Sequence, residues 1–168
     1  MGPYNTTRNR QETLPGAMAG GVILVTGGAV RIGREICLNL AKDGFSVAVH
    51  YNSSSNEANS LVEKITSNGG TAQSFSANLS DVSMVGNLFS DIKDSLGVVT
   101  GIVNNASLFS FDDINSLSKQ SWDNHMHVNA LVPLLMISEL SRNIPSDCVG
   151  SVVNILDQKI SQPNPDYL

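Results

Sequence analysis

The chain has 168 residues, of which 41% are hydrophobic and 15% charged, and its formal net charge is −5. This length and composition predict one globular domain with a substantial core. An acidic chain without a polybasic segment argues against nucleic acid as a partner, and the absence of a run of 18 apolar residues argues against a membrane span.

The first twenty residues are polar and lack the apolar region of a secretory signal. We therefore expect residues 1–20 to be a disordered leader or a cloning remnant, followed by one domain over residues 21–168. Without a signal, a cytoplasmic location is expected.

Short apolar runs alternate with stretches of helical periodicity from residue 22 onward. The apolar runs predict five strands, at residues 22–26, 45–51, 71–77, 100–106 and 150–156. The periodic stretches predict four helices, at residues 32–44, 55–70, 81–97 and 118–144. Ser80 or Asp81 is placed to cap the third helix. This alternation predicts an α/β fold with a doubly wound parallel sheet, for which the commonest strand order is 3-2-1-4-5.

The first strand runs into a glycine-rich turn, TGGAVRIG, at residues 26–33. Glycines in such a turn allow backbone amides to approach a pyrophosphate, and the following helix presents its positive N-terminus. The turn follows a strand and opens a helix, which is the context that a dinucleotide site needs. An ordinary turn without a ligand is the alternative.

The second strand ends in His50, Tyr51, Asn52, Ser53 and Ser54, with no carboxylate among them. An acidic residue at this point would bind the ribose of NAD, whereas hydroxyls, an amide and a nearby arginine suit a 2′-phosphate. The pattern therefore favours NADP(H) over NAD(H). The serines also fit a helix-capping turn, and the two roles are compatible.

Taken together, these motifs resemble those of the short-chain dehydrogenases/reductases, which have a Rossmann-type fold. The glycine motif TGxxxGxG of that family is present with Arg31 in place of its second glycine. Asn104-Asn105-Ala106 matches its NNAG stretch with Ser107 replacing the glycine, and Asn129 matches an asparagine of the long fourth helix. The combination TGGAxRIG, HYxxS and NNAS is most similar to the pteridine reductase branch.

The resemblance implies a set of site residues for NADP(H) and a substrate. Phe109 is expected to stack on a pterin ring, and Asn129 to belong to the proton path. The expected cofactor-binding residues are Gly27, Arg31, Ile32, Gly33, His50, Tyr51, Asn52, Ser53, Ser54, Asn78, Leu79, Asn105, Ala106 and Ser107.

Asp157 follows the fifth strand, where the family normally has a catalytic serine. An aspartate at this point resembles the pteridine reductase branch, which implies roles in proton supply and substrate orientation. A carboxyl group beside an apolar cofactor face could have a raised pKa and act as an acid. The alternative is that Asp157 only caps the turn that follows.

The family's proton donor is a tyrosine, helped by a lysine four residues later. Tyr167 is too close to Asp157 to match that tyrosine, and Lys159 lies on the wrong side, so we expect the pair beyond Leu168. The last strands of the family sheet are expected to be absent as well. The chain is then part of a longer enzyme, one of two chains produced by a nick, or a truncated binder. The polar, proline-containing run near the end favours the first two.

The predicted function is an NADPH-dependent reductase that acts on a small molecule, with a pterin C=N bond as the candidate target. Two alternatives remain, a ketoacyl-type carbonyl reductase of the same family and a non-catalytic NADP-binding or regulatory module. The resemblance also implies a homo-oligomer, a dimer or a tetramer. No metal site is expected, because His125 and His127 are two residues apart and do not share a helix face.

Overall fold

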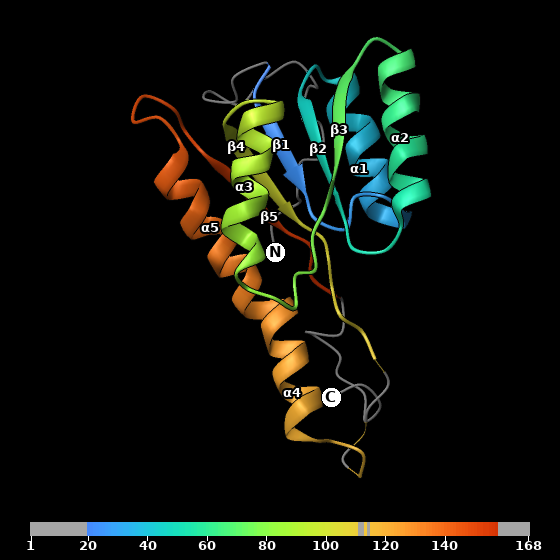
Figure 1. The fold of residues 1–168 in the computed structure, drawn as a ribbon, viewed down its shortest axis with the longest axis vertical. Coiled ribbons are helices and arrows are strands. Elements are labelled where there is room, and N and C mark those ends of the chain that lie inside the picture. The colour runs from blue at the N-terminus through green and yellow to red at the C-terminus, as the bar shows by residue number, and fades with distance from the viewer. Residues whose placement is uncertain (1–19, 111–112, 114, 158–168) are drawn as a thin grey trace, which may run out of the picture.

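The computed structural model describes residues 20–110, 113 and 115–157, which form a central sheet with helices on both faces (Figure 1). The expected disordered leader, apart from Gly20, and the run with Lys159 and Tyr167 lie outside the described residues. The elements in chain order are β1 (Val22–Val25), α1 (Arg31–Lys42), β2 (Ser46–Tyr51), α2 (Ser55–Ser67), β3 (Thr71–Ser76), α3 (Met84–Ser95), β4 (Val99–Asn104), α4 (Lys119–Met126), η1 (His127–Leu131), α5 (Val132–Asn143) and β5 (Ser151–Asn154).

The five strands form one parallel sheet in the order β3-β2-β1-β4-β5, which confirms the predicted α/β fold and its strand order. All strands run downward in Figure 1, so their carboxyl ends meet at the lower edge of the sheet. The order reverses at β1, which lies between β2 and β4. In sheets of this kind, ligands bind at that edge near the point of reversal.

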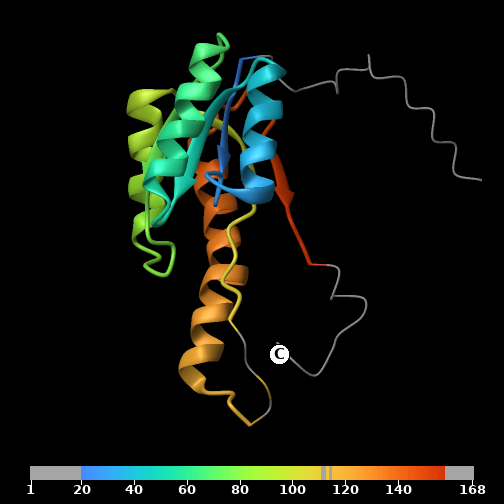
Figure 2. The same ribbon diagram turned by 90° about the vertical axis from the view of Figure 1, so that its right-hand side faces the viewer.

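Helices cover both faces of the sheet (Figure 2). The central strands accordingly bury alternate side chains in two separate clusters. Leu24 faces a cluster that α3 and α5 complete with Leu88 and Met136. Val25 faces a second cluster that α1 and α2 complete with Cys37 and Leu61. Side chains of β1 belong to both apolar clusters, so the strand is packed on both faces. This packing also determines where the turn after β1 lies.

The third helix begins later than the sequence pattern predicts. It starts at Met84, and its N-cap is Ser83 without a side-chain capping bond, so the prediction that Ser80 or Asp81 caps it was wrong. The Asp81 carboxylate instead accepts hydrogen bonds from the Ser83 amide at 3.0 Å and the Ser83 hydroxyl at 2.6 Å. These bonds lower the pKa of Asp81 and close a separate turn before the helix.

The predicted helix over residues 118–144 is three consecutive segments, because a π-helical stretch, η1, separates α4 from α5. Pro133 has no amide hydrogen, and its ring crowds the carbonyl of the residue four positions earlier, which is Asn129. The helix widens just before this proline, and the Val132 amide donates to the His127 carbonyl five residues back. Such π segments are frequent at functional sites.

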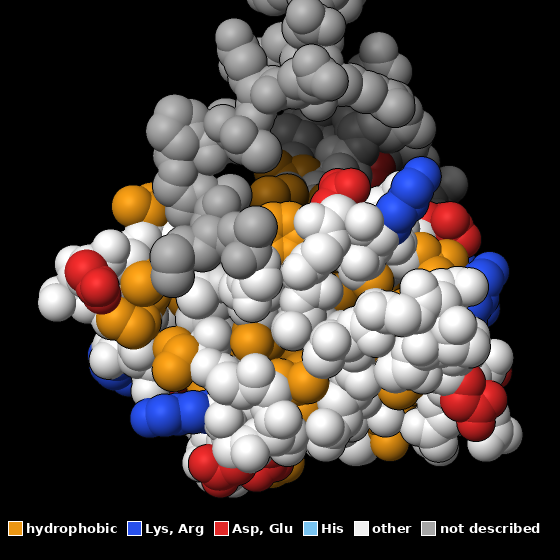
Figure 3. Space-filling model, turned by 90° about the horizontal axis from the view of Figure 1, so that it is seen from above, with side chains coloured by type: hydrophobic (Ala, Val, Ile, Leu, Met, Phe, Trp, Pro, Cys, Tyr) orange, Lys and Arg blue, Asp and Glu red, His pale blue; other side chains and the backbone are white. Residues whose placement is uncertain are grey.

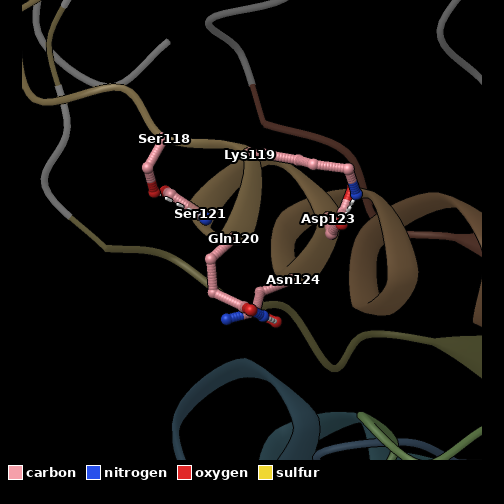
Figure 4. Close-up of polar contacts among 6 residues, drawn as sticks. All are labelled: Ser118, Lys119, Gln120, Ser121, Asp123 and Asn124. Atoms are coloured by element: carbon pink, nitrogen blue, oxygen red, sulfur yellow. Dashed lines mark hydrogen bonds and ion pairs between the residues drawn. The ribbon is translucent and has the colours of Figure 1, made fainter.

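The start of α4 is stabilised by contacts between near neighbours (Figure 4). The Ser118 hydroxyl accepts a hydrogen bond from the Ser121 amide at 3.1 Å, the capping arrangement that serine favours. Lys119 forms an ion pair with Asp123 one turn later, and the Gln120 amide donates to Asn124 at 2.9 Å. No residue of α4 is buried, so packing contributes little to its position.

The strand β5 forms an edge of the sheet, and all four of its residues are exposed. Seen from above Figure 1, at the amino ends of the strands, acidic and basic side chains are dispersed (Figure 3). Neither positive nor negative charge is concentrated on one side of this face. Within the part of the chain that the structure describes, no helix is both long and apolar enough to cross a bilayer.

Candidate functional site

The turn between β1 and α1 packs so closely against its neighbours that Gly33 has no room for a side chain and Gly27 has little. A Cβ on Gly33 would lie 2.2 Å from the Gly27 carbonyl oxygen and 2.7 Å from the Asn105 Nδ2 atom. Gly27 itself has a φ of +61°, and a Cβ there would lie 3.1 Å from the Cα of Ala106. The start of α1 is thereby pressed against both the turn and the segment after β4.

Arg31 opens α1 with a φ of +52°, and it has the only positive φ among the described non-glycine residues. This left-handed conformation costs an L-residue roughly 1–2 kcal/mol relative to the right-handed one. The family pattern has glycine here, which would adopt it without strain. Strain of this kind is retained where a side chain serves a function. Arg31 and Ile32 are both exposed at the edge of the sheet.

Thr26 joins the glycine turn to the segment after β4. Its hydroxyl oxygen accepts hydrogen bonds from the backbone amides of Asn105 and Ala106, both at 3.0 Å. In the reverse direction, the Asn105 side-chain amide donates to the carbonyls of Thr26 and Gly27, also at 3.0 Å. Sequence reasoning missed Thr26 as a positioning residue. The signal was present in a hydroxyl that directly follows a buried strand and precedes the first glycine.

His50, near the end of β2, is 2% exposed and contacts the turns on both sides of its strand. Its Nδ1 atom accepts a hydrogen bond from the Gly27 amide at 3.1 Å, and its Nε2 atom lies 3.0 Å from the Ala77 carbonyl oxygen. Burial lowers the pKa of this imidazole below 6.5, although the Ala77 bond acts in the other direction. The side chain is therefore a neutral group between two loops.

The segment after β2 presents the polar residues expected to bind phosphate. Tyr51 is half-buried at the strand end, Asn52 and Ser53 are exposed, and Ser54 is the N-cap of α2 without a side-chain capping bond. The helix-capping role therefore does not use the Ser54 hydroxyl. Because β1 and β2 are neighbours, this segment lies beside the turn that carries Arg31.

The segment after β3 carries two of the expected cofactor-binding residues, one exposed and one buried. Asn78 is exposed, and its side-chain oxygen accepts a hydrogen bond from the Ser80 amide at 3.0 Å. The side chain of Leu79 is 5% exposed and packs in the core cluster with α3. Of these two predicted cofactor-binding residues, only Asn78 therefore presents a side chain to the surface.

The segment after β4 is held by the π-helical stretch. Asn129 lies within η1, and its amide group forms a pair of hydrogen bonds with the Leu108 backbone, from the Leu108 amide at 2.8 Å and to the Leu108 carbonyl at 2.9 Å. Ser107 and Phe109, on either side of Leu108, are both exposed, Phe109 by 66%. Asn129 is thus brought together with the predicted substrate residue.

The neighbouring strands β4 and β5 are joined at their carboxyl ends by paired asparagines. The Asn104 amide nitrogen donates to the Asn154 side-chain oxygen at 2.8 Å, and the Ile155 amide donates to the Asn104 carbonyl at 2.9 Å. Asp157 follows shortly after as an exposed residue at the same edge. Sequence reasoning did not single out Asn154, which anchors the segment that carries Asp157.

Two other titratable side chains near the site are engaged by the backbone. Burial raises the pKa of the Cys37 thiol to about 12, so it stays protonated beneath the glycine turn and is no nucleophile. His125 accepts from the Ser110 amide at 3.4 Å and contacts the Ser121 carbonyl at 2.8 Å. Among residues 20–110, 113 and 115–157, no group of three or more His, Cys, Asp or Glu side chains could hold a metal ion.

The doubly wound parallel sheet and its close-packed glycine turn define a nucleotide-binding α/β protein. The family model described as short chain dehydrogenase matches residues 21–167, and the chain belongs to this family. The family resemblance of the sequence motifs is thereby confirmed.

The relatives of the chain include several reductases. The crystal structure of FolM alternative dihydrofolate reductase 1 from Brucella canis, complexed with NADP, is 37% identical with a TM-score of 0.84, and the match covers 89% of this chain and 60% of that one. The angucycline C-6 ketoreductase LanV with bound NADP is 28% identical with a TM-score of 0.81, covering 90% of this chain and 61% of that one. The 3-oxoacyl-[acyl-carrier-protein] reductase FabG of Staphylococcus epidermidis is 28% identical, over 84% of this chain and 58% of its own length. The chain thus spans about three fifths of the relatives that it matches.

Proposed function

We propose that the protein is an NADPH-dependent reductase and that its cofactor binds across the carboxyl edge of β1, β2 and β4. The observation that carries this proposal is the strained backbone of Arg31, with a φ of +52° at a position where glycine would be unstrained. A guanidinium group offers a charged fork of donors that matches a phosphate. A 2′-phosphate distinguishes NADP from NAD. Its interaction with the guanidinium group would offset the backbone strain at Arg31.

The residues present fit such a cofactor. The absence of a side chain at Gly33 lets the start of α1 pack directly against the glycine turn. The N-terminus of that helix is where a pyrophosphate would bind. The segment after β2 contributes hydroxyl and amide groups and no carboxylate to repel a 2′-phosphate. NADPH supplies a hydride when it is bound. The residues that would hold it are Gly27, Arg31, Ile32, Gly33, Tyr51, Asn52, Ser53, Ser54, Asn78, Leu79, Asn105, Ala106 and Ser107.

For the substrate, we propose a pterin-like ring whose C=N bond is reduced. Phe109 is largely exposed next to the expected cofactor site and offers an aromatic face for stacking. Asp157 would hold or supply a proton for the reduced nitrogen. Asn129 would belong to the proton path, as the resemblance of the long fourth helix implies. The 37% identity to a dihydrofolate reductase supports this choice.

Carbonyl reduction is the second candidate, favoured by the likeness to FabG and LanV, both 28% identical. The two substrates make different demands on Asp157 and Phe109. A flat heterocycle needs the aromatic face and a proton at nitrogen, whereas an acyl thioester needs neither. Removing either side chain would therefore abolish pterin reduction and leave carbonyl reduction less affected.

The test measures NADPH oxidation by the purified protein with dihydropteridine or dihydrofolate and, separately, with a 3-oxoacyl thioester. Faster turnover of the pterin, lost in Asp157→Ala and Phe109→Ala, is the expected result. Preference for the thioester would establish the carbonyl alternative. Tight NADPH binding without oxidation in the presence of either substrate would refute the proposed enzymatic function. It would favour the alternative of a non-catalytic NADP-binding or regulatory module.

We also propose that the protein assembles with copies of itself through α4 and α5. Large apolar side chains are exposed along these helices at Trp122, Met126, Leu131 and Leu134. They lie on successive segments of this helical run, α4, η1 and α5, where a second copy could bury them. Sedimentation of Leu134→Glu beside the unchanged protein checks this. The expected result is a smaller species for the variant.

A further inference from the structure

The imidazole of His50 lies between two loops of the proposed site, and each loop is bound to one ring nitrogen. The Gly27 amide, in the glycine turn, donates to Nδ1 at 3.1 Å. The Ala77 carbonyl, directly before Asn78, lies 3.0 Å from Nε2. The ring is 2% exposed, so water cannot replace either partner without a rearrangement of the loops.

These two partners determine the protonation state of the ring. A backbone amide can only donate a hydrogen bond, and a backbone carbonyl can only accept one. Nδ1 must therefore carry a lone pair and Nε2 a hydrogen, which is one particular tautomer of the neutral imidazole. A charged imidazolium would direct an N–H group at the Gly27 amide. Burial lowers the pKa of His50 and thereby keeps the ring neutral.

His50 also binds the next residue of the turn through its backbone. The Gly28 amide donates to the His50 carbonyl at 2.8 Å. The amides of Gly27 and Gly28 are thus both directed toward β2, so in the proposed site a phosphate would bind at the N-terminus of α1. In addition, the Ala77 amide donates to the Tyr51 carbonyl at 3.1 Å, so β2 holds the segment after β3 by its backbone as well.

We propose that His50 is a positioning residue of the cofactor site, whose neutral ring sets the separation between the glycine turn and the segment 77–79. The proposal rests on the proposed NADPH site. His50 acts through Gly27 and Ala77 and touches neither the cofactor nor the reacting atoms. In the proposed site the adenosine end of NADPH lies between these two loops, so their separation should affect cofactor affinity more than the rate of the chemical step.

Two conservative variants separate the two ring contacts. In His50→Asn, the amide oxygen is as many bonds from Cα as Nδ1 and keeps an acceptor for Gly27. In His50→Gln, the amide nitrogen is as many bonds from Cα as Nε2 and keeps a donor for Ala77. His50→Leu removes both contacts and serves as the apolar control.

The first measurement is the Kd for NADPH, followed by cofactor fluorescence in the purified protein. We expect His50→Asn and His50→Gln each to bind NADPH about threefold more weakly than the unchanged protein, because each keeps only one of the two contacts that bridge the loops. His50→Leu keeps neither contact and should bind about tenfold more weakly. Affinities in all three variants equal to that of the unchanged protein, or equal losses in all three, would reduce His50 to a packing residue and overturn the proposal.

The second measurement needs no cofactor. Nitrogen NMR of His50 should show the neutral ring with its hydrogen on Nε2, and the Gly27 amide should exchange slowly in the unchanged protein and in His50→Asn but faster in His50→Gln. A hydrogen on Nδ1, or equal Gly27 exchange in both variants, would contradict the bridge. If the unchanged protein binds no NADPH, the proposed function is refuted, and the positioning role of His50 is refuted as well. If the unchanged protein binds NADPH and none of the three variants differs from it in affinity, only the role of His50 fails.

Discussion

The glycine-turn side of the molecule and the α4 side are stabilised in different ways. Around the turn, Thr26, His50 and Asn105 form hydrogen bonds with partners 23 to 80 residues away in sequence. At α4, the contacts are between residues three or four apart, except for the 3.4 Å contact of His125 with the Ser110 amide, and no side chain of the helix is buried. Substitutions near the turn should therefore lower the free energy of unfolding substantially, whereas those in α4 should change it little.

The largest effect is expected for Gly33→Ala. The new Cβ would lie 2.2 Å from a backbone oxygen that cannot move without displacing the turn. We expect a loss of more than about 3 kcal/mol in the free energy of unfolding, together with loss of NADPH binding. Denaturant unfolding measures the first and fluorescence titration the second.

Gly86→Ala is the matched control for that change. Gly86 lies in α3, and no other atom lies within 4 Å of the point where its Cβ would stand. Alanine should therefore stabilise the helix by about 0.5–1 kcal/mol. A similar loss of stability in both variants would show that crowding at the turn is not the cause.

Thr26→Val tests the connection between β1 and β4. Valine has nearly the same shape but cannot accept the hydrogen bonds from Asn105 and Ala106, which leaves two amides without their partner. We expect a loss of about 2–3 kcal/mol, measured by urea unfolding. Thr100→Val removes a single bond to the Val22 carbonyl and should lose less than about 1 kcal/mol. A smaller loss of unfolding free energy in Thr26→Val than in Thr100→Val would show that the Thr26 hydroxyl does not stabilise the connection between β1 and β4.

Arg31→Gly and Arg31→Ala separate backbone strain from charge. Both variants lack the guanidinium, so both should lose the preference for NADPH over NADH by about tenfold or more. Only glycine relieves the left-handed backbone, so Arg31→Gly should be more stable than Arg31→Ala by about 1 kcal/mol. Affinity titrations and thermal unfolding check the two effects. An unchanged cofactor preference in both variants would exclude a 2′-phosphate role for Arg31.

The stability of the protein should also depend on pH through His50. Burial lowers the pKa of His50 in the folded protein below the value of 6.5 that it has when unfolded. Between these two pKa values the unfolded chain binds a proton that the folded chain does not, so stability is full above pH 6.5 and falls as the pH decreases below it. Urea unfolding from pH 7.5 to about 5 should show a steeper decline in the unchanged protein than in His50→Asn. Parallel profiles would show that another group is responsible.

The smallest effect is expected on the α4 side, for Lys119→Ala. Lys119 and Asp123 form an exposed ion pair one helical turn apart, and such pairs contribute about 0.3–0.5 kcal/mol. Thermal unfolding at low and high salt should differ little between the variant and the unchanged protein. A loss comparable to that of Thr26→Val would mean that α4 is not stabilised locally.

Much of the fold could be predicted because its signals are local. Apolar runs, helical periodicity and the alternation of strands with helices lead to the parallel sheet and its order. The start of α3 could not be predicted, because the competition between a turn at Asp81 and a helix is decided by the turn's own hydrogen bonds to Ser83. The π-helical stretch also escaped prediction, since periodicity does not register one widened turn before Pro133.

The sequence by itself determined which residue types collect after each strand, and hence the family and the expected cofactor site. Only the tertiary structure decided which of those residues face the edge and which support it. Leu79 and His50 were both expected to line the site, yet the Leu79 side chain packs in the core and the His50 ring binds Gly27 and Ala77. The physical reason is that hydrogen bonding and burial depend on partners distant in sequence, which no local pattern records.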